Sequence, residues 1–257
     1  MAAGVAPSPL TVRRLALRRL LARRPEIWLY GVSGVAGMVV LAVALTQQGD
    51  GSRRAAQVSW ADRWSLMTAW SGWMAMVIAM MLPVIAPQAR HVALRSLRRR
   101  RHRAMVGYVA GYLAVWALVG AALVVTLHRA GVPHPPAGLA VAALLAAAIW
   151  QVSEPRRRVL RRCGSLRLGA PKGLAADRDC ATVGWRSGLR CAFTCAPVMV
   201  ASAAAHHDPA VMGAVFVLLL TERAPGPNPA QRAGRPLEAW ALVGLAAAVA
   251  LVAVART

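Results

Sequence analysis

Acidic residues are scarce in this chain of 257 residues: nine Asp and Glu stand against 31 Lys and Arg, a formal net charge of +22. Charged residues make up 16% of the chain and apolar residues 58%, whereas a soluble domain usually carries about 25% charge. The high apolar content also excludes intrinsic disorder, which requires low hydrophobicity. Four cysteines are too few for a disulfide framework. The composition therefore predicts an integral membrane protein.

The motifs of soluble enzymes are missing as well. The chain has no G-x-S-x-G nucleophile motif, no phosphate-binding loop and no H-E-x-x-H zinc motif. Because no catalytic constellation is visible, we expect a protein that is not an enzyme.

Seven apolar stretches approach the length of about 20 residues that a helix needs to cross a membrane. The fifth and sixth are short, with only His206-His207-Asp208-Pro209 between them; two spans are preferred over one re-entrant hairpin. The first follows an Arg-rich leader and ends in an A-x-A-like cleavage pattern, but its apolar core exceeds that of a signal peptide, which favours an uncleaved anchor. The predicted spans are 27–46, 64–87, 105–128, 136–154, 188–205, 207–222 and 237–255.

The basic residues predict the orientation of these spans. Segments between spans are alternately rich and poor in Lys and Arg, and cytoplasmic segments are the rich ones. The predicted fold class is all-α: a polytopic transmembrane helix bundle of about seven spans, N-terminus inside and C-terminus outside, in the inner (plasma) membrane. Residues 1–26 would form a basic cytoplasmic segment, residues 27–257 the transmembrane helical domain, and 155–187 its long cytoplasmic loop.

The arginine run at 98–103 lies between two strong spans. We therefore interpret it as a cytoplasmic retention signal that contacts the headgroups of the lipid bilayer. A nucleic-acid partner is not expected.

Five residues of the fifth span share a stripe about 80° wide on a helix. They are Cys191, Cys195, Met199, Ser202 and His206. Cys and Met are the ligands that select Cu(I), and thiolates also suit zinc. The alternative is that Cys and Met simply fill the core, which is favoured for either cysteine alone. For the whole stripe, metal binding is favoured.

Other residues could complete such a site. Glu222 ends an otherwise apolar span, and carboxylates at such positions are functional candidates. The predicted cytoplasmic loop contributes Cys163, and the outer side contributes two histidines as a relay. The predicted metal-ligating residues are Cys191, Cys195, Met199, Cys163, Glu222, Met81, His206 and His207.

The Met-rich second span resembles a bacterial family of unknown function whose members are described as metal-binding integral membrane proteins. The hallmark of that family is a segment very similar to A-M-M-L-P, which stands here at Ala79 to Pro83, with Ala86-Pro87 following. The resemblance covers roughly residues 64 to 222. It implies a polytopic membrane protein that binds a metal.

Two further blocks carry the same resemblance. One is an aromatic-Gln pair, Trp150-Gln151, followed by a basic stretch with Cys163; Val159 stands where similar proteins often have another Cys. The other is a G-L-x-C-x-x-x-C start of the fifth span, where Thr194 replaces a Cys that often precedes the second one. In register with it are Met199, Met212 and a closing Glu222.

Three functions follow from these patterns. The leading hypothesis is a membrane protein that binds copper, or alternatively zinc, and handles it or delivers it to a metalloenzyme or other partner protein. The second is a non-enzymatic scaffold or assembly subunit whose cysteines are inert. The third and least favoured is a thiol-redox membrane enzyme, because an i, i+4 cysteine pair on a regular helix lies near the outer limit of disulfide geometry.

Overall fold

The computed structural model describes residues 24–49, 63–130, 137–162, 173–205, 208–223 and 236–255. Over these residues the chain is helical and has no strand, which confirms the predicted all-α class. The elements are α2 (Ile27–Gly49), α3 (Arg63–Arg95), η2 (Arg98–Arg100), α4 (Arg101–Arg129), α5 (Ala137–Val152), α6 (Glu154–Arg162), α7 (Gly173–Ala204), α8 (Pro209–Arg223) and α10 (Pro236–Ala255).

Each predicted span falls on a helix, but the helices differ in length. Among the described residues, four are long and apolar enough to cross a membrane: Ile27–Leu45, Leu66–Arg95, Arg98–Arg129 and Gly173–Ala204. The bent pair of α5 and α6, with an angle of 63° at its break, would add a fifth. The apolar parts of α8 and α10 are shorter. Seven complete spans and their orientation therefore stay predictions.

Two helices continue well beyond the predicted spans. Helix α3 ends only at Arg95, and the stretch 155–187, expected as a loop, contains most of α6 and the first half of α7. Hydropathy marks only the apolar part of a helix, whereas Ala and Arg are good helix formers in any setting. Ala176, Cys180 and Gly184 are also buried at a spacing of four residues, which gives the polar half of α7 an inward face.

Helices α4 and α7 approach each other closely enough for backbone to touch backbone. A Cβ atom on Gly111 would collide with the carbonyl oxygen of Ala181, and one on Gly184 with that of Tyr108. On Gly188 it would lie 2.9 Å from a third carbonyl oxygen. Such contacts are made by residues without a side chain. We call this contact, centred on Gly111, Gly184 and Gly188, the glycine seam.

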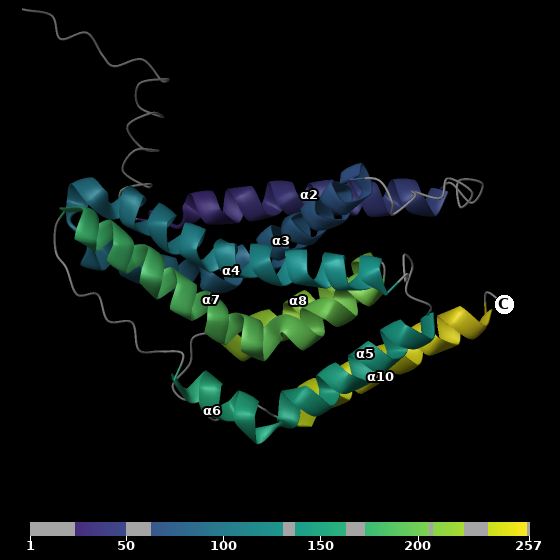
Figure 1. Ribbon diagram of the computed structural model, residues 1–257. Helices are drawn as coiled ribbons and strands as arrows, with labels where there is room; N and C mark the ends of the chain where they lie inside the picture. The colour runs from purple at the N-terminus through teal and green to yellow at the C-terminus, as the bar shows by residue number, and fades with distance from the viewer. Residues whose placement is uncertain are drawn as a thin grey trace, which may run out of the picture.

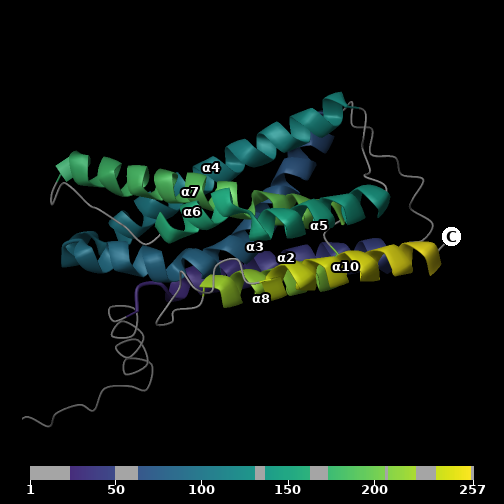
Figure 2. The same cartoon turned by 90° about the horizontal axis from the view of Figure 1, so that it is seen from below.

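The remaining helices surround this pair. Helix α3 packs between α2 and α4, while α5 packs against both α7 and α10 (Figure 1). The view from below shows α6 continuing from α5 beside α7 (Figure 2). One buried cluster runs through α3, α4, α5, α7 and α8. Helix α7 is thus covered by α4 along the glycine seam and by α5, α6 and α8 around its second half.

The arginine run at 98–103 forms η2 and the first turn of α4. Arg100 binds the Asp177 carboxylate and donates to the carbonyl oxygen of Gly173 at 2.8 Å. Arg103 reaches the same carboxylate at 2.7 Å. Gly173 has a positive φ of 78°, a conformation that favours glycine. These arginines therefore fasten the start of α7 to the start of α4.

Candidate metal centre

Helix α7 turns the predicted stripe toward the protein interior. Cys191, Cys195 and Met199 have exposed fractions of 1%, 0% and 0%, and Ser202 is also fully buried. The last member of the stripe, His206, lies outside the described residues. The structure thus places both thiols and the thioether of the stripe in the core.

The two thiols lie next to each other without being bonded. The Sγ atoms of Cys191 and Cys195 are 3.8 Å apart, whereas a disulfide would need about 2.05 Å, and neither cysteine is in a disulfide. An ion placed about 2.3 Å from each sulfur, the usual Zn–S distance, would bridge them at an angle of about 110°. The pair is therefore spaced so that both sulfurs can bind one soft metal ion.

One hydroxyl group lies next to each of the two thiols. The Tyr112 hydroxyl, from α4, donates to Cys191 Sγ at 3.0 Å. The Thr194 hydroxyl oxygen lies 3.5 Å from Cys195 Sγ and donates to backbone carbonyl oxygens one turn back. A hydroxyl that donates to sulfur stabilises negative charge on it. The glycine seam makes the Tyr112 contact possible because it brings α4 close to α7.

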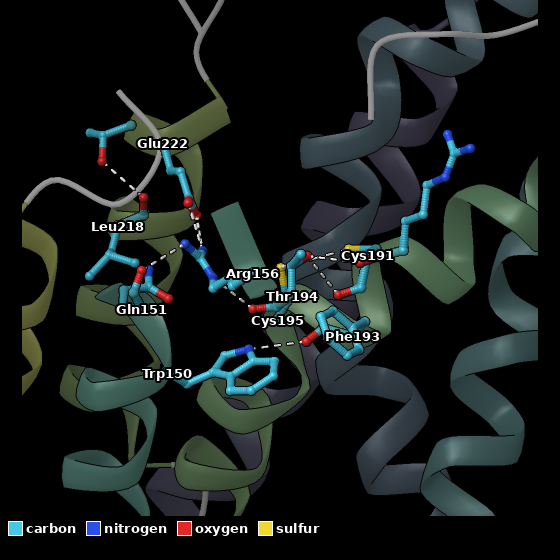
Figure 3. A network of polar contacts seen from close by, with 11 residues as sticks. Trp150, Gln151, Arg156, Cys191, Phe193, Thr194, Cys195, Leu218 and Glu222 are labelled. Carbon is cyan, nitrogen blue, oxygen red and sulfur yellow. Dashed lines mark hydrogen bonds and ion pairs between the residues drawn. The ribbon is translucent and has the colours of Figure 1, made fainter. Parts of the chain in front are cut away.

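A buried ion pair lies beside the thiols (Figure 3). Both carboxylate oxygens of Glu222 contact Nη2 of Arg156, at 2.6 and 2.7 Å, and the two side chains are 1% and 0% exposed. The same guanidinium donates from Nε to the Thr194 carbonyl oxygen at 3.1 Å and from Nη1 to that of Gln151 at 3.3 Å. Arg156 thus joins α5, α7 and α8 at one point.

One partner of this ion pair, Glu222, was predicted from the sequence as a functional residue, and the other, Arg156, was not. Glu222 was expected as a metal ligand, but its carboxylate is held by Arg156. Arg156 was assigned to the cytoplasmic loop, whereas α6 brings it into the core. A lone carboxylate at the end of an apolar helix requires a cation, and this was the signal that could have revealed an arginine.

The aromatic-Gln pair at the end of α5 is also tied to α7. Trp150 donates from Nε1 to the carbonyl oxygen of Phe193 at 3.1 Å, and the two rings meet edge to face. The Gln151 side chain is fully buried, and its amide nitrogen and oxygen have no hydrogen-bond partner in the described part of the chain. A buried amide without partners is costly.

The other predicted ligands are less well placed or lie outside the described residues. Met81 is fully buried in α3 and belongs to the same core cluster as Met199. Cys163, His206 and His207 fall outside the described residues. A further thiol, Cys180, is buried at the glycine seam, in a stretch that was expected to be a loop.

The soft donors that the described residues bring together are two thiols and a thioether on one stripe of α7. In the described parts of the chain no group of three or more His, Cys, Asp or Glu residues could hold a metal ion. Thiolates and thioethers are the ligands that select Cu(I), and thiolates also suit zinc. The two thiols are adjacent, and Met199 stands four residues beyond Cys195 on the same buried stripe.

The family of the chain follows from a comparison with known proteins. A family model named PpoB2 and described as copper chaperone matches residues 70–250, well over half of the chain. No curated protein and no solved structure matches the chain. The description names a carrier of copper and not an enzyme, which confirms the prediction of a non-enzymatic, metal-related protein. This chain belongs to the PpoB2 copper chaperone family.

Proposed function

We propose that this chain is an integral membrane copper chaperone that holds Cu(I) on Cys191 and Cys195 and delivers it to a partner protein. The observation that carries the proposal is the buried thiol pair, not joined by a disulfide, with sulfurs 3.8 Å apart, in a chain that belongs to a copper chaperone family. Copper is the cargo, so it must bind tightly enough to be carried and loosely enough to be released.

The surroundings of the thiols suit this task. Tyr112 donates a hydrogen bond to Cys191 and stabilises the sulfur when it carries negative charge. Met199 lies about one turn beyond Cys195 on the same buried stripe and can supply a thioether as third ligand. The core around the pair keeps water away from the bound ion. Release then requires a partner whose own soft ligands replace those of α7.

The exposed apolar side chains of the helices support the proposal that the chain lies in a membrane. Along α2, large apolar side chains are mostly exposed, among them Val35 at 58% and Met38 at 65%. Only 17% of the apolar window of this helix is buried. A long apolar surface of this kind is unfavourable in water and suits the hydrocarbon of a bilayer. The distribution of arginine favours a cytoplasmic N-terminus.

The proposal is tested by a Cu(I) competition titration of the reduced, detergent-purified chain against a chromogenic Cu(I) chelator. We expect about one ion per chain in the wild type and none in the Cys191→Ser/Cys195→Ser variant. Cys180→Ser is the matched control, because this thiol is buried on the same helix but away from the pair. It should bind like the wild type.

Two other results would contradict the proposal. Absence of copper binding by the folded wild type would favour a scaffold whose cysteines only fill the core. Equal losses in Cys180→Ser and in the double variant would mean that copper binding depends on general packing of α7. The membrane part is tested separately by alkaline extraction of cell membranes: the chain should stay with the lipid, and its release would contradict a membrane-spanning fold.

A further inference from the structure

We propose that the positive charge of Arg156 stabilises the negatively charged, copper-loaded thiol pair. Glu222 partly cancels that positive charge, so that this ion pair sets the copper affinity. The inference rests on the proposed function, since it concerns the same thiols. Nothing in the family description assigns a role to either residue. Arg156 would not bind copper itself. It would change the copper affinity through its charge and through its hydrogen bond to the backbone of the thiol helix.

A short chain of contacts joins the guanidinium to the thiols. Arg156 Nε donates to the Thr194 carbonyl oxygen at 3.1 Å, and the Thr194 hydroxyl oxygen lies 3.5 Å from Cys195 Sγ. Cys195 Sγ lies 3.8 Å from Cys191 Sγ. Figure 3 shows Arg156 between Glu222 and the segment that carries Thr194 and Cys195. The positive group is therefore held on the backbone of the thiol helix.

Copper binding changes the charge of this buried region. Each thiol loses its proton to bulk water when its sulfur binds the ion, so that two thiolates and one Cu(I) leave a net charge of minus one. A buried net charge is unfavourable unless an opposite charge lies close to it. Arg156 is fully buried and is fixed to the residue that precedes Cys195, so it can compensate this charge.

Glu222 reduces the extent to which Arg156 can compensate the negative charge of the copper-loaded thiols. Its two carboxylate oxygens engage Nη2 of Arg156, so the ion pair has no net charge in the empty protein. A guanidinium without this carboxylate would attract the anionic copper complex more strongly. The pair therefore keeps the affinity below the largest value that the thiols could reach, as a protein that must release its cargo requires.

The test removes each charge of the ion pair in turn and measures the dissociation constant for Cu(I) by chelator competition. Glu222→Gln leaves Arg156 positive and should tighten copper binding by about tenfold or more. Arg156→Gln leaves Glu222 negative and should weaken binding by a similar factor. The double variant Arg156→Gln/Glu222→Gln has again no net charge and should lie between the two.

The opposite signs separate this role from a structural one. If the ion pair only holds helices together, both single variants lower the melting temperature and neither binds copper more tightly than the wild type; that result would overturn the inference. Glu154→Gln is the matched control, because Glu154 pairs with Arg158 on the same helix but is half exposed. Its copper affinity should equal that of the wild type.

Two further measurements keep the result unambiguous. Arg156→Lys retains the charge and should bind copper much as the wild type does, even if Arg156→Gln fails to fold. Stoichiometry is measured together with affinity in every variant. If the wild type binds one ion on Cys191 and Cys195 but Glu222→Gln does not bind it more tightly, the proposed function stands and this inference fails. If the wild type binds no copper, both fail.

Discussion

Helix α7 is held in two physically different ways. On the side of α4 the glycine seam brings backbone against backbone, with Gly184 against the Tyr108 carbonyl oxygen. Toward α6 and α8 it is held by a fully buried guanidinium, which bridges Thr194 and Glu222. The first contact depends on the absence of side chains, and the second on full compensation of a buried charge.

The thiol pair lies where these two contacts meet. Cys191 receives its hydrogen bond across the seam, from Tyr112. Cys195 follows Thr194, whose carbonyl oxygen accepts the bond from Arg156. The seam therefore fixes the position of one sulfur, and the ion pair fixes the backbone at the other. Variants on the two sides of α7 should have different effects.

The largest loss of stability is expected on the charged side. Arg156→Ala leaves the buried Glu222 without its cation, which costs about 3–5 kcal/mol when one partner of a buried pair is removed. Thermal unfolding of the detergent-purified chain measures the loss. Arg158→Ala, on the same helix but with a side chain 72% exposed, is the control. Equal effects of the two substitutions would mean that Arg156 is not buried.

A smaller loss, of about 1–3 kcal/mol, is expected at the glycine seam for Gly184→Ala. The added Cβ must displace the backbone of α4, which is a case of overpacking. Gly213→Ala on α8 is the matched control, because an added Cβ there meets nothing within 4 Å. The same unfolding measurement applies. A Gly184→Ala variant as stable as the wild type would show that the helices are not in backbone contact.

Tyr112→Phe sharpens the comparison through function. Loss of the hydrogen bond to Cys191 should remove about 1 kcal/mol of stabilisation from the loaded site, which is about a fivefold rise in the dissociation constant for Cu(I). Tyr108→Phe is the control, since the Tyr108 hydroxyl lies one turn away and is hydrogen-bonded with Gln88 and Ser187 instead. Equal affinities of the Tyr112→Phe variant and the wild type would exclude a role for this bond.

The smallest effect is expected for Arg103→Ala. Arg103 pairs with Asp177 at 2.7 Å, but its side chain is 65% exposed, and exposed ion pairs contribute about 0–1 kcal/mol. Arg100 also holds Asp177, so unfolding should change little. A loss as large as that of Arg156→Ala would remove the distinction between the exposed and the buried arginine.

Much of the fold could be predicted from apolar length alone, because the described part of each predicted stretch lies almost entirely on helices. The polar half of α7 could not, since its segment has many charged residues and hydropathy scores it as a loop. A different signal was available there: Ala176, Cys180, Gly184 and Gly188 recur every four residues, a spacing that marks one face of a helix. All four are buried.

The candidate site could be predicted only in part, for a similar reason. The stripe of Cys191, Cys195 and Met199 follows from helical periodicity, because all three stand on one helix. The partners Tyr112 and Arg156 come from other helices, and their positions depend on how α4 and α6 pack. Two further arginines follow Arg156 directly in the chain, and only the bend between α5 and α6 decides which one enters the core.

The most direct test of the central claim is X-ray absorption at the copper edge of the wild-type chain loaded with one equivalent of Cu(I). A site on Cys191 and Cys195, with or without Met199, predicts a copper neighbour shell of two or three sulfur atoms and no nitrogen or oxygen. The Cys180→Ser variant should give the same spectrum. A shell dominated by nitrogen or oxygen would contradict the account, because copper would then be bound away from the thiol pair.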